Sequence, residues 1–114
     1  MRLVGSKTEQ DFREELERSN AALQDPESKL RYVLEGNGYR VSRAYVLHWI
    51  PEQLEDIYLV LIDGSFLVNV EIEKYEQASL TQVEEMDLKA YVHGLSKVNQ
   101  MRLAVAQDLA LGKT

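Results

Sequence analysis

The pair Asp63-Gly64 constrains the fold of this chain more than any other feature of the sequence. It stands between two runs rich in apolar and β-branched residues, IYLVLI before it and FLVNVEI shortly after it. A dipeptide of this kind between such runs is the strongest short-range signal for a β-hairpin closed by a two-residue turn. The sequence therefore predicts two antiparallel strands that meet at this turn.

The two-residue turn also predicts the register of the hairpin. If Ile62 faces Ser65, then Asp56 lies directly across from Glu71, and directly opposed side chains share one face of a sheet. Glu73 follows on the same face because strand side chains alternate. The register thus predicts a patch of three carboxylates at the open end of the hairpin. The other face is apolar and is predicted to be core, through Ile57, Leu59, Leu61, Phe66, Val68, Val70 and Ile72.

Such a patch needs a reason, because two carboxylates at this spacing repel by about 3 kcal/mol if they are partly buried. A bound Mg²⁺ or Mn²⁺ would turn the repulsion into coordination, since both ions prefer oxygen ligands. The alternatives are a neighbouring Arg or Lys and a plain solvated strand end whose charges discourage edge pairing. Arg43 is one candidate, but the first strand's register is open by one residue, which leaves the faces of Arg43 and Trp49 open too.

The remaining patterns predict an α+β fold, a three-stranded antiparallel β-meander flanked by helices. The expected elements are a peripheral N-terminal helix over about 8–24, a helix over 26–36, strands over 39–50, 56–62 and 65–73, and a helical segment over 79–111. Ser6 and Thr81 each begin a capping-box pattern, and Asp25 precedes a proline suited to a first helical position. Gly94 leaves two alternatives, one long helix or a first helix that ends at His93 before Ser96 caps a second. IYLVLI is apolar at every position, so helices are expected on both faces of the sheet.

Length and composition set further limits. The 114 residues suit one domain, 1–114, and the absence of cysteine excludes disulfides and thiol chemistry. A net charge of −6 without any basic run argues against avid, nonspecific binding of nucleic acid by an isolated chain. The start of the chain lacks a signal-peptide pattern and no stretch reaches membrane-spanning length, so a cytoplasmic protein without a membrane partner is expected.

The order of these motifs resembles the core of the PD-(D/E)xK nuclease superfamily. A helix followed by Gly-Tyr, a strand, an acidic residue that opens a second strand, the Asp-Gly hairpin, VNVEIEK and a further helix stand in that order, over about 27–97. The resemblance implies a restriction-endonuclease-like α-β-β-β-α core. It also implies that Asp56 and Glu71 occupy the two acidic metal-ligand positions, whereas Glu73 stands where the family usually has Lys.

Two functional hypotheses follow. The resemblance implies a nuclease-like domain that hydrolyses DNA phosphodiesters with Mg²⁺ or Mn²⁺, or an inactive descendant of one. Asp56 and Glu71 would then hold the metal and Glu73 would act as ligand or general base. The alternative is a noncatalytic acidic protein-interaction or regulatory module, which the net charge favours. The heptad-like apolar stripe of the last helical segment is compatible with a homodimer or with ordinary core packing.

Overall fold

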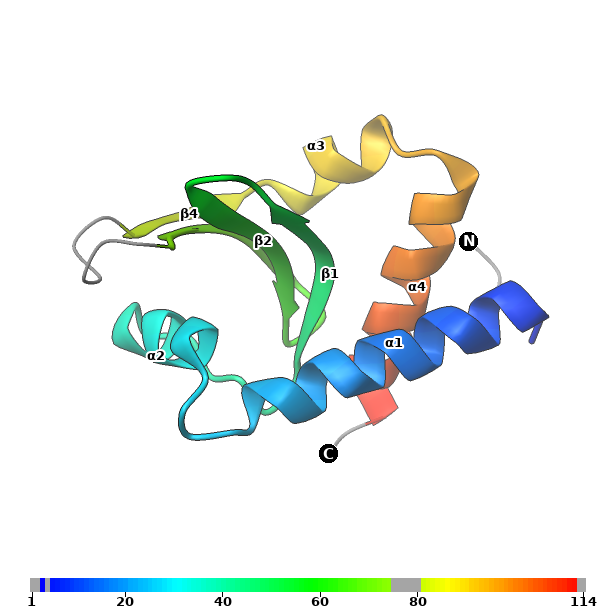
Figure 1. Ribbon diagram of the computed structural model, residues 1–114. Coiled ribbons are helices and arrows are strands. Elements are labelled where there is room, and N and C mark those ends of the chain that lie inside the picture. Colours follow the sequence, from blue (N-terminus) through cyan, green and yellow to red (C-terminus); the bar gives the residue numbers. More distant parts are fainter. Residues whose placement is uncertain (1–2, 4, 75–80, 113–114) are drawn as a thin grey trace.

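The computed structural model describes residues 3, 5–74 and 81–112. Its elements are α1 (Lys7–Leu23), α2 (Lys29–Gly36), β1 (Ala44–Pro51), β2 (Glu55–Ile62), β3 (Phe66–Glu73), β4 (Thr81–Met86), α3 (Leu88–His93) and α4 (Lys97–Gly112). The strands form an antiparallel sheet of order β1-β2-β3-β4, flanked by helices (Figure 1). None of the described helices combines the length and apolar character that a membrane span requires.

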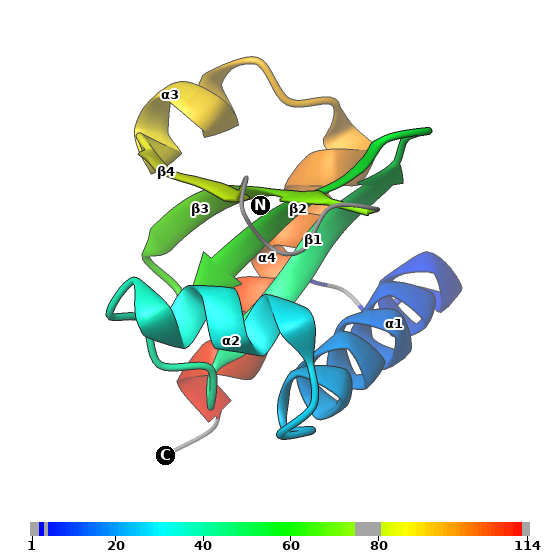
Figure 2. The same cartoon turned by 60° about the vertical axis from the view of Figure 1, so that its left-hand side comes forward.

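Both faces of the sheet are covered, as the apolar run in β2 predicts. On one face, here called the α2 face, Val60 and Ile62 pack with Leu34 of α2. On the other, here called the α4 face, Leu61 packs with Val105 of α4 and with residues of α1. Figure 2 shows α2 and α4 on opposite sides of the sheet. The mixed α+β class and the helical cover on both faces are therefore confirmed.

The sheet has four strands rather than the predicted three. The sequence predicts a helix for the segment that forms β4, because Thr81 and Glu84 fit a capping box. In the structure Thr81–Met86 instead pairs with β3 along its whole length. Val83 packs against the core of the α2 face, while Glu84 is exposed. The pairing satisfies backbone groups that β3 would otherwise leave open at a sheet edge. The expected start of that helix at Ser79 lies outside the described residues.

The N-terminal helix is integral to the fold and not peripheral as expected. Its capping residue is confirmed, since the Ser6 hydroxyl accepts a hydrogen bond from the backbone N–H of Glu9 at 3.1 Å. Phe12 and Leu16 are buried in the core of the α4 face. The helix packs against both β1 and α4, because its thin apolar stripe is long enough to reach both elements.

Side chains from the C-terminal half of α1 also cover part of the free edge of β1. The Asn20 amide donates to the carbonyls of Ser42 and Ala44 at 3.0 and 3.1 Å. The Ser19 hydroxyl accepts a hydrogen bond from the backbone N–H of Val46 at 3.0 Å. These bonds replace the pairing that a further strand would supply, so α1 closes the first half of this edge.

The second helix begins later than predicted. Its N-cap is Ser28, whose hydroxyl accepts from the backbone N–H of Arg31 at 3.1 Å. Asp25, the expected cap, instead accepts from the N–H of Glu27 at 2.9 Å in the turn before the helix. The chain leaves the helix through Gly38, whose φ of 89° is a left-handed conformation that favours glycine.

Gly94 separates two helices, which confirms the second of the two alternatives. It is the C-cap of α3, which ends at His93. The Ser96 hydroxyl then accepts from the backbone N–H of Asn99 at 3.2 Å at the start of α4. The chain can therefore change direction between α3 and α4, as Figure 1 shows.

Candidate functional site

The hairpin turn forms where the sequence predicts it, but the register differs by one residue. Asp63 and Gly64 both have left-handed backbone, with φ of 55° and 75°, and the N–H of Ser65 donates to the carbonyl of Ile62 at 3.1 Å. The strand pairing then begins with Ile62 opposite Phe66, so that Ser65 is left out of it. The predicted register, with Ile62 opposite Ser65, is therefore wrong.

This shift divides the predicted carboxylate patch, because a one-residue slip moves side chains to the other face. Asp56 lies opposite Ile72, and both belong to the α2 face. Glu71 lies opposite Ile57 on the α4 face, and Glu73 follows it there. The expected arrangement of Asp56 across from Glu71 does not occur.

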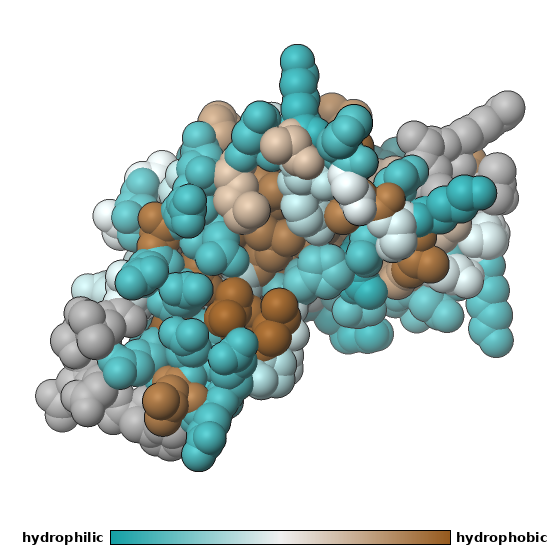
Figure 3. Space-filling model, turned by 90° about the horizontal axis from the view of Figure 1, so that it is seen from above, coloured by the Kyte–Doolittle hydropathy of each residue, from teal (hydrophilic) through white to brown (hydrophobic). Residues whose placement is uncertain are grey.

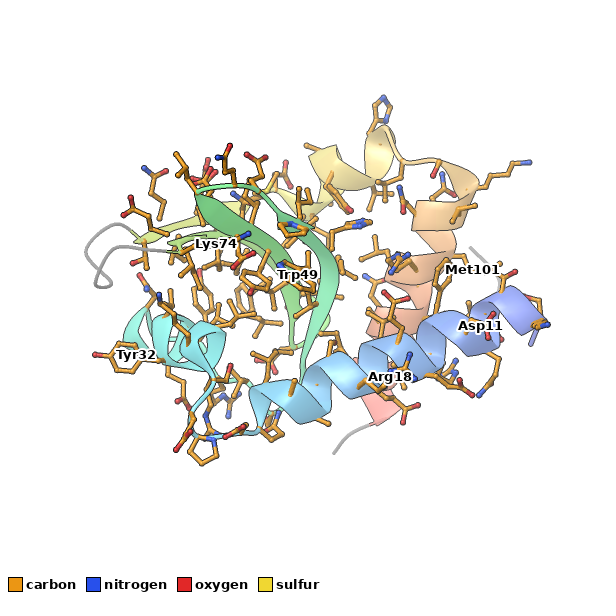
Figure 4. The ribbon with its side chains drawn as sticks, viewed as in Figure 1. Asp11, Arg18, Tyr32, Trp49, Lys74 and Met101 are labelled. Atoms are coloured by element: carbon orange, nitrogen blue, oxygen red, sulfur yellow. The ribbon has the colours of Figure 1, made fainter. Side chains whose placement is uncertain are left out.

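Asp56 is held by two neighbours on the α2 face. The indole N–H of Trp49 donates to its Oδ1 at 3.1 Å, and the Lys74 ammonium lies 3.7 Å from the same oxygen. The Trp49 ring stacks on Tyr58 with 6.3 Å between ring centroids and 6° between planes. Burial, and then the charge of Asp56, raise the pKa of Tyr58. Trp49 and Lys74 are labelled in Figure 4. A neighbouring Lys therefore offsets the charge of Asp56.

A different set of acids gathers at the same end of the α4 face. Glu55, and not the predicted Asp56, shares this face with Glu71 and Glu73, and it lies directly opposite Glu73. Together with Glu52 of the β1–β2 loop and Glu71, they line a depression of about 430 Å³, along with Leu54 and two glutamines. These seven residues, here called the acidic depression, include no basic side chain.

One oxygen in the acidic depression stands out. Oε2 of Glu73 is inaccessible to solvent and has no hydrogen-bond partner in the described part of the chain. An unsatisfied buried acceptor of this kind costs free energy in the folded protein. Figure 3 views this end of the molecule, where hydrophilic residues predominate and a few apolar side chains lie between them.

The arrangement does not fit the predicted Mg²⁺ or Mn²⁺ site. Asp56 lies on the opposite face from Glu71 and Glu73. Within residues 3, 5–74 and 81–112, no group of three or more Asp, Glu or His side chains is arranged to hold a metal ion. The catalytic and metal-binding roles of Asp56, Glu71 and Glu73 stay predictions.

Arg43, considered from the sequence as a neutralising partner, and His48 lie away from the acidic depression. Arg43 forms an ion pair with Asp63 at 3.4 Å, at the turn end of the hairpin, and so does not neutralise Asp56 or Glu71. His48 lies opposite Leu59 on the α4 face. Burial, and then the nearby Arg102 guanidinium, lower the pKa of His48.

Sequence reasoning missed Glu55 and Glu52 as members of the acidic surface. The signal that could have found Glu55 is its position next to Asp56, because adjacent acids place one carboxylate on each face whatever the register. Glu52 lies in the loop between β1 and β2, where the strand pattern gives no indication of direction.

Comparisons with known proteins return no match, whether to a family model, to a curated protein or to a solved structure. The function is therefore inferred from the charge and geometry of the chain itself.

Proposed function

We propose that this chain is a noncatalytic protein-interaction module whose acidic depression binds a basic segment of a partner protein. The observation that carries the proposal is the gathering of four glutamates around one hollow that no basic side chain lines. Like charges placed this close are unfavourable in the free protein, and a partner's lysine or arginine side chains would relieve that cost.

The opposite face supports the same assignment. Asp56, the acid that the sequence placed with Glu71, is already paired with Lys74 and bonded to Trp49. Among the described residues, Asp56 has a basic partner, whereas no salt bridge involves the four glutamates of the acidic depression. The net charge of −6 adds long-range attraction for a basic partner and speeds association at low salt.

A binding assay with a simple basic probe tests this proposal. An alternating lysine–serine heptapeptide is titrated into the protein, with an alternating glutamate–serine heptapeptide as the negative control. We expect only the basic peptide to bind, with an affinity that falls as salt is added because the contacts are exposed ion pairs.

Matched variants locate the contact. Glu71→Gln with Glu73→Gln should weaken binding about 2- to 30-fold, from about 0.2–1 kcal/mol for each exposed pair lost. Glu14→Gln with Glu27→Gln changes the net charge by the same amount at exposed positions outside the depression. If both double variants weaken binding equally, the depression is not the binding site and the proposal fails.

The metal-dependent nuclease stays a prediction from the family resemblance. It requires Mn²⁺ to bind, and a ligand at about a hundred times its Kd would raise the free energy of unfolding by about 2.7 kcal/mol. Thermal unfolding with and without Mn²⁺ measures metal binding. Digestion of single-stranded, duplex and branched DNA with Mg²⁺ measures cleavage. DNA cleavage that is abolished by Glu71→Gln would overturn the noncatalytic assignment.

A further inference from the structure

The two edge strands of the sheet differ in what they offer to a further strand. On β1, α1 covers the first half, a register shift lies between Val46 and His48, and Pro51 has no backbone N–H. β4 contains no proline and pairs with β3 without a register shift. Of the described elements, only β3 lies alongside β4. The outer edge of β4 can therefore pair with another strand, because an edge strand turns alternate N–H and C=O groups away from its sheet.

The charges of β4 select between the strands that could pair with it. Glu84 and Glu85 are exposed, and neither forms a salt bridge with a described residue. Two copies joined at this edge would bring these acids together, and each copy carries a net charge of −6. Like charges on neighbouring strands are unfavourable, whereas a basic strand complements them. The edge therefore favours a basic foreign segment over a second copy of the chain.

On the α4 face, β4 borders the acidic depression. Gln82 of β4 lines the depression and lies directly opposite Glu71 of β3. Glu84 follows on the same face, because strand side chains alternate. Neighbouring strands lie about 4.8 Å apart, which places Glu71 about 10 Å from the backbone of a strand added to β4. A long basic side chain with its aliphatic stem across Gln82 would then lie close to both acids.

On the α2 face, the same edge is more apolar. Val83 is half-buried and packs against the core of this face. Thr81 lines a hollow of about 510 Å³ together with Val33 and Tyr32 of α2. Tyr32, which is labelled in Figure 4, is 77% exposed. Apolar side chains of an added strand would cover Val83, since apolar cross-strand pairs stabilise a sheet.

We propose, on the basis of the proposed function, that the partner's basic segment adds to β4 as an extended strand in which basic and apolar residues alternate. The basic residues lie on the α4 face, across Gln82 and between Glu84 and Glu71. The apolar residues lie on the α2 face beside Val83. Main-chain hydrogen bonds to β4 supply affinity, and the two faces supply specificity for the alternating pattern.

Peptides with blocked amides test whether the segment binds as a strand. An alternating lysine–valine heptapeptide is prepared unmodified, with N-methyl groups on the lysine amides alone, and with N-methyl groups on the valine amides alone. Only one of these sets faces β4 in an added strand, because residues on one face turn their N–H groups to the same side. We expect one methylated peptide to bind at least about tenfold more weakly than the unmodified peptide, from the loss of about three hydrogen bonds, and the other to bind within about twofold of it.

Two further comparisons locate the strand and its faces. Glu84→Lys places a like charge beside the basic residues at a position that does not line the depression, and it should weaken lysine–valine binding at least about threefold. Glu14→Lys makes the same charge change at an exposed position of α1, and screening should keep its effect within about twofold at 0.15 M salt. Alternating lysine–serine should bind at least about threefold more weakly than lysine–valine, because valine covers Val83 and favours an extended strand.

The outcomes separate the two proposals. If both methylated peptides bind equally, the segment does not add as a strand, and this inference alone is overturned. Equal effects of Glu84→Lys and Glu14→Lys, or equal binding of the valine and serine peptides, also overturn it alone. Failure of every basic peptide to bind overturns the proposed function and this inference with it. Sedimentation that reveals a dimer which the lysine–valine peptide dissociates would assign the edge to a second copy of the chain and overturn the inference.

Discussion

Replacing Asn20 with alanine is expected to lower the free energy of unfolding by about 1.5 to 3.5 kcal/mol. Asn20 is only 4% exposed, and its amide donates to the carbonyls of Ser42 and Ala44 at the edge of β1. Loss of the two hydrogen bonds removes about 2 kcal/mol of stability, and the carbonyls that lose their donor remove at most about 2 kcal/mol more. The higher helix propensity of alanine returns about 0.5 kcal/mol.

Urea unfolding monitored by circular dichroism measures this change, with Gln24→Ala as the matched control. Gln24 donates to the Val41 carbonyl at 2.9 Å, three residues before β1 begins, but Gln24 is an exposed residue. Loss of the hydrogen bond to Val41 should lower the free energy of unfolding by about 0.5 to 1.5 kcal/mol. Asn20→Asp should cost more than Asn20→Ala, because a carboxylate would face two carbonyl oxygens. If Asn20→Ala costs less than Gln24→Ala, the buried amide does not hold α1 on the sheet edge.

Three further predictions concern the turn, the acidic depression and the histidine of β1. Gly64→Ala should destabilise by about 1 to 2 kcal/mol, since its φ of 75° is left-handed; Gly36→Ala in α2 should instead stabilise slightly, and equal effects in urea unfolding would contradict this. Glu73→Gln should raise stability by about 0.2 to 1 kcal/mol at low salt, because Glu55 lies directly opposite; a gain that persists in molar salt would point to another cause. The folded-state pKa of His48 lies below its ordinary value of 6.5. The stability that the neutral imidazole contributes is therefore fully present above pH 6.5 and is lost as the pH falls through the folded-state pKa. His48→Gln should therefore lose less stability than the wild type between about pH 7 and 5, with exposed His93→Gln behaving as the wild type.

The strands of the central hairpin were predictable, but their register was not. Asp63 and Gly64 form the turn that the sequence indicates. The pairing differs because Ser65 is left out of it, and the apolar pattern could not reveal this. Residues 57–62 are apolar at every position, so a slip of one residue moves no polar side chain of that run into the core. Register is weakly specified in such a strand when both of its faces are buried.

The fourth strand was missed for a different reason. Thr81 and Glu84 satisfy a helix-capping pattern, yet the same segment alternates Thr and Val with Gln and Glu, as a half-buried strand does. The local signals are balanced. The edge of β3 selects the strand by pairing with it. A pattern within Thr81–Met86 alone contains no information on that partner.

The acidic surface could be predicted from the sequence, whereas the chemistry assigned to it could not. Glu55 and Asp56 are adjacent, so one of them joins Glu71 and Glu73 in either register. Negative charge therefore gathers at this end of the sheet whichever register forms. A metal site is more demanding, because it needs particular oxygens at ligand distance, and a one-residue slip replaces Asp56 by the longer Glu55 and alters every distance. Binding of a basic segment tolerates such a slip because exposed charge pairs have loose geometry. That tolerance is the physical reason why we propose recognition of a partner, rather than metal-dependent catalysis, for the acidic depression.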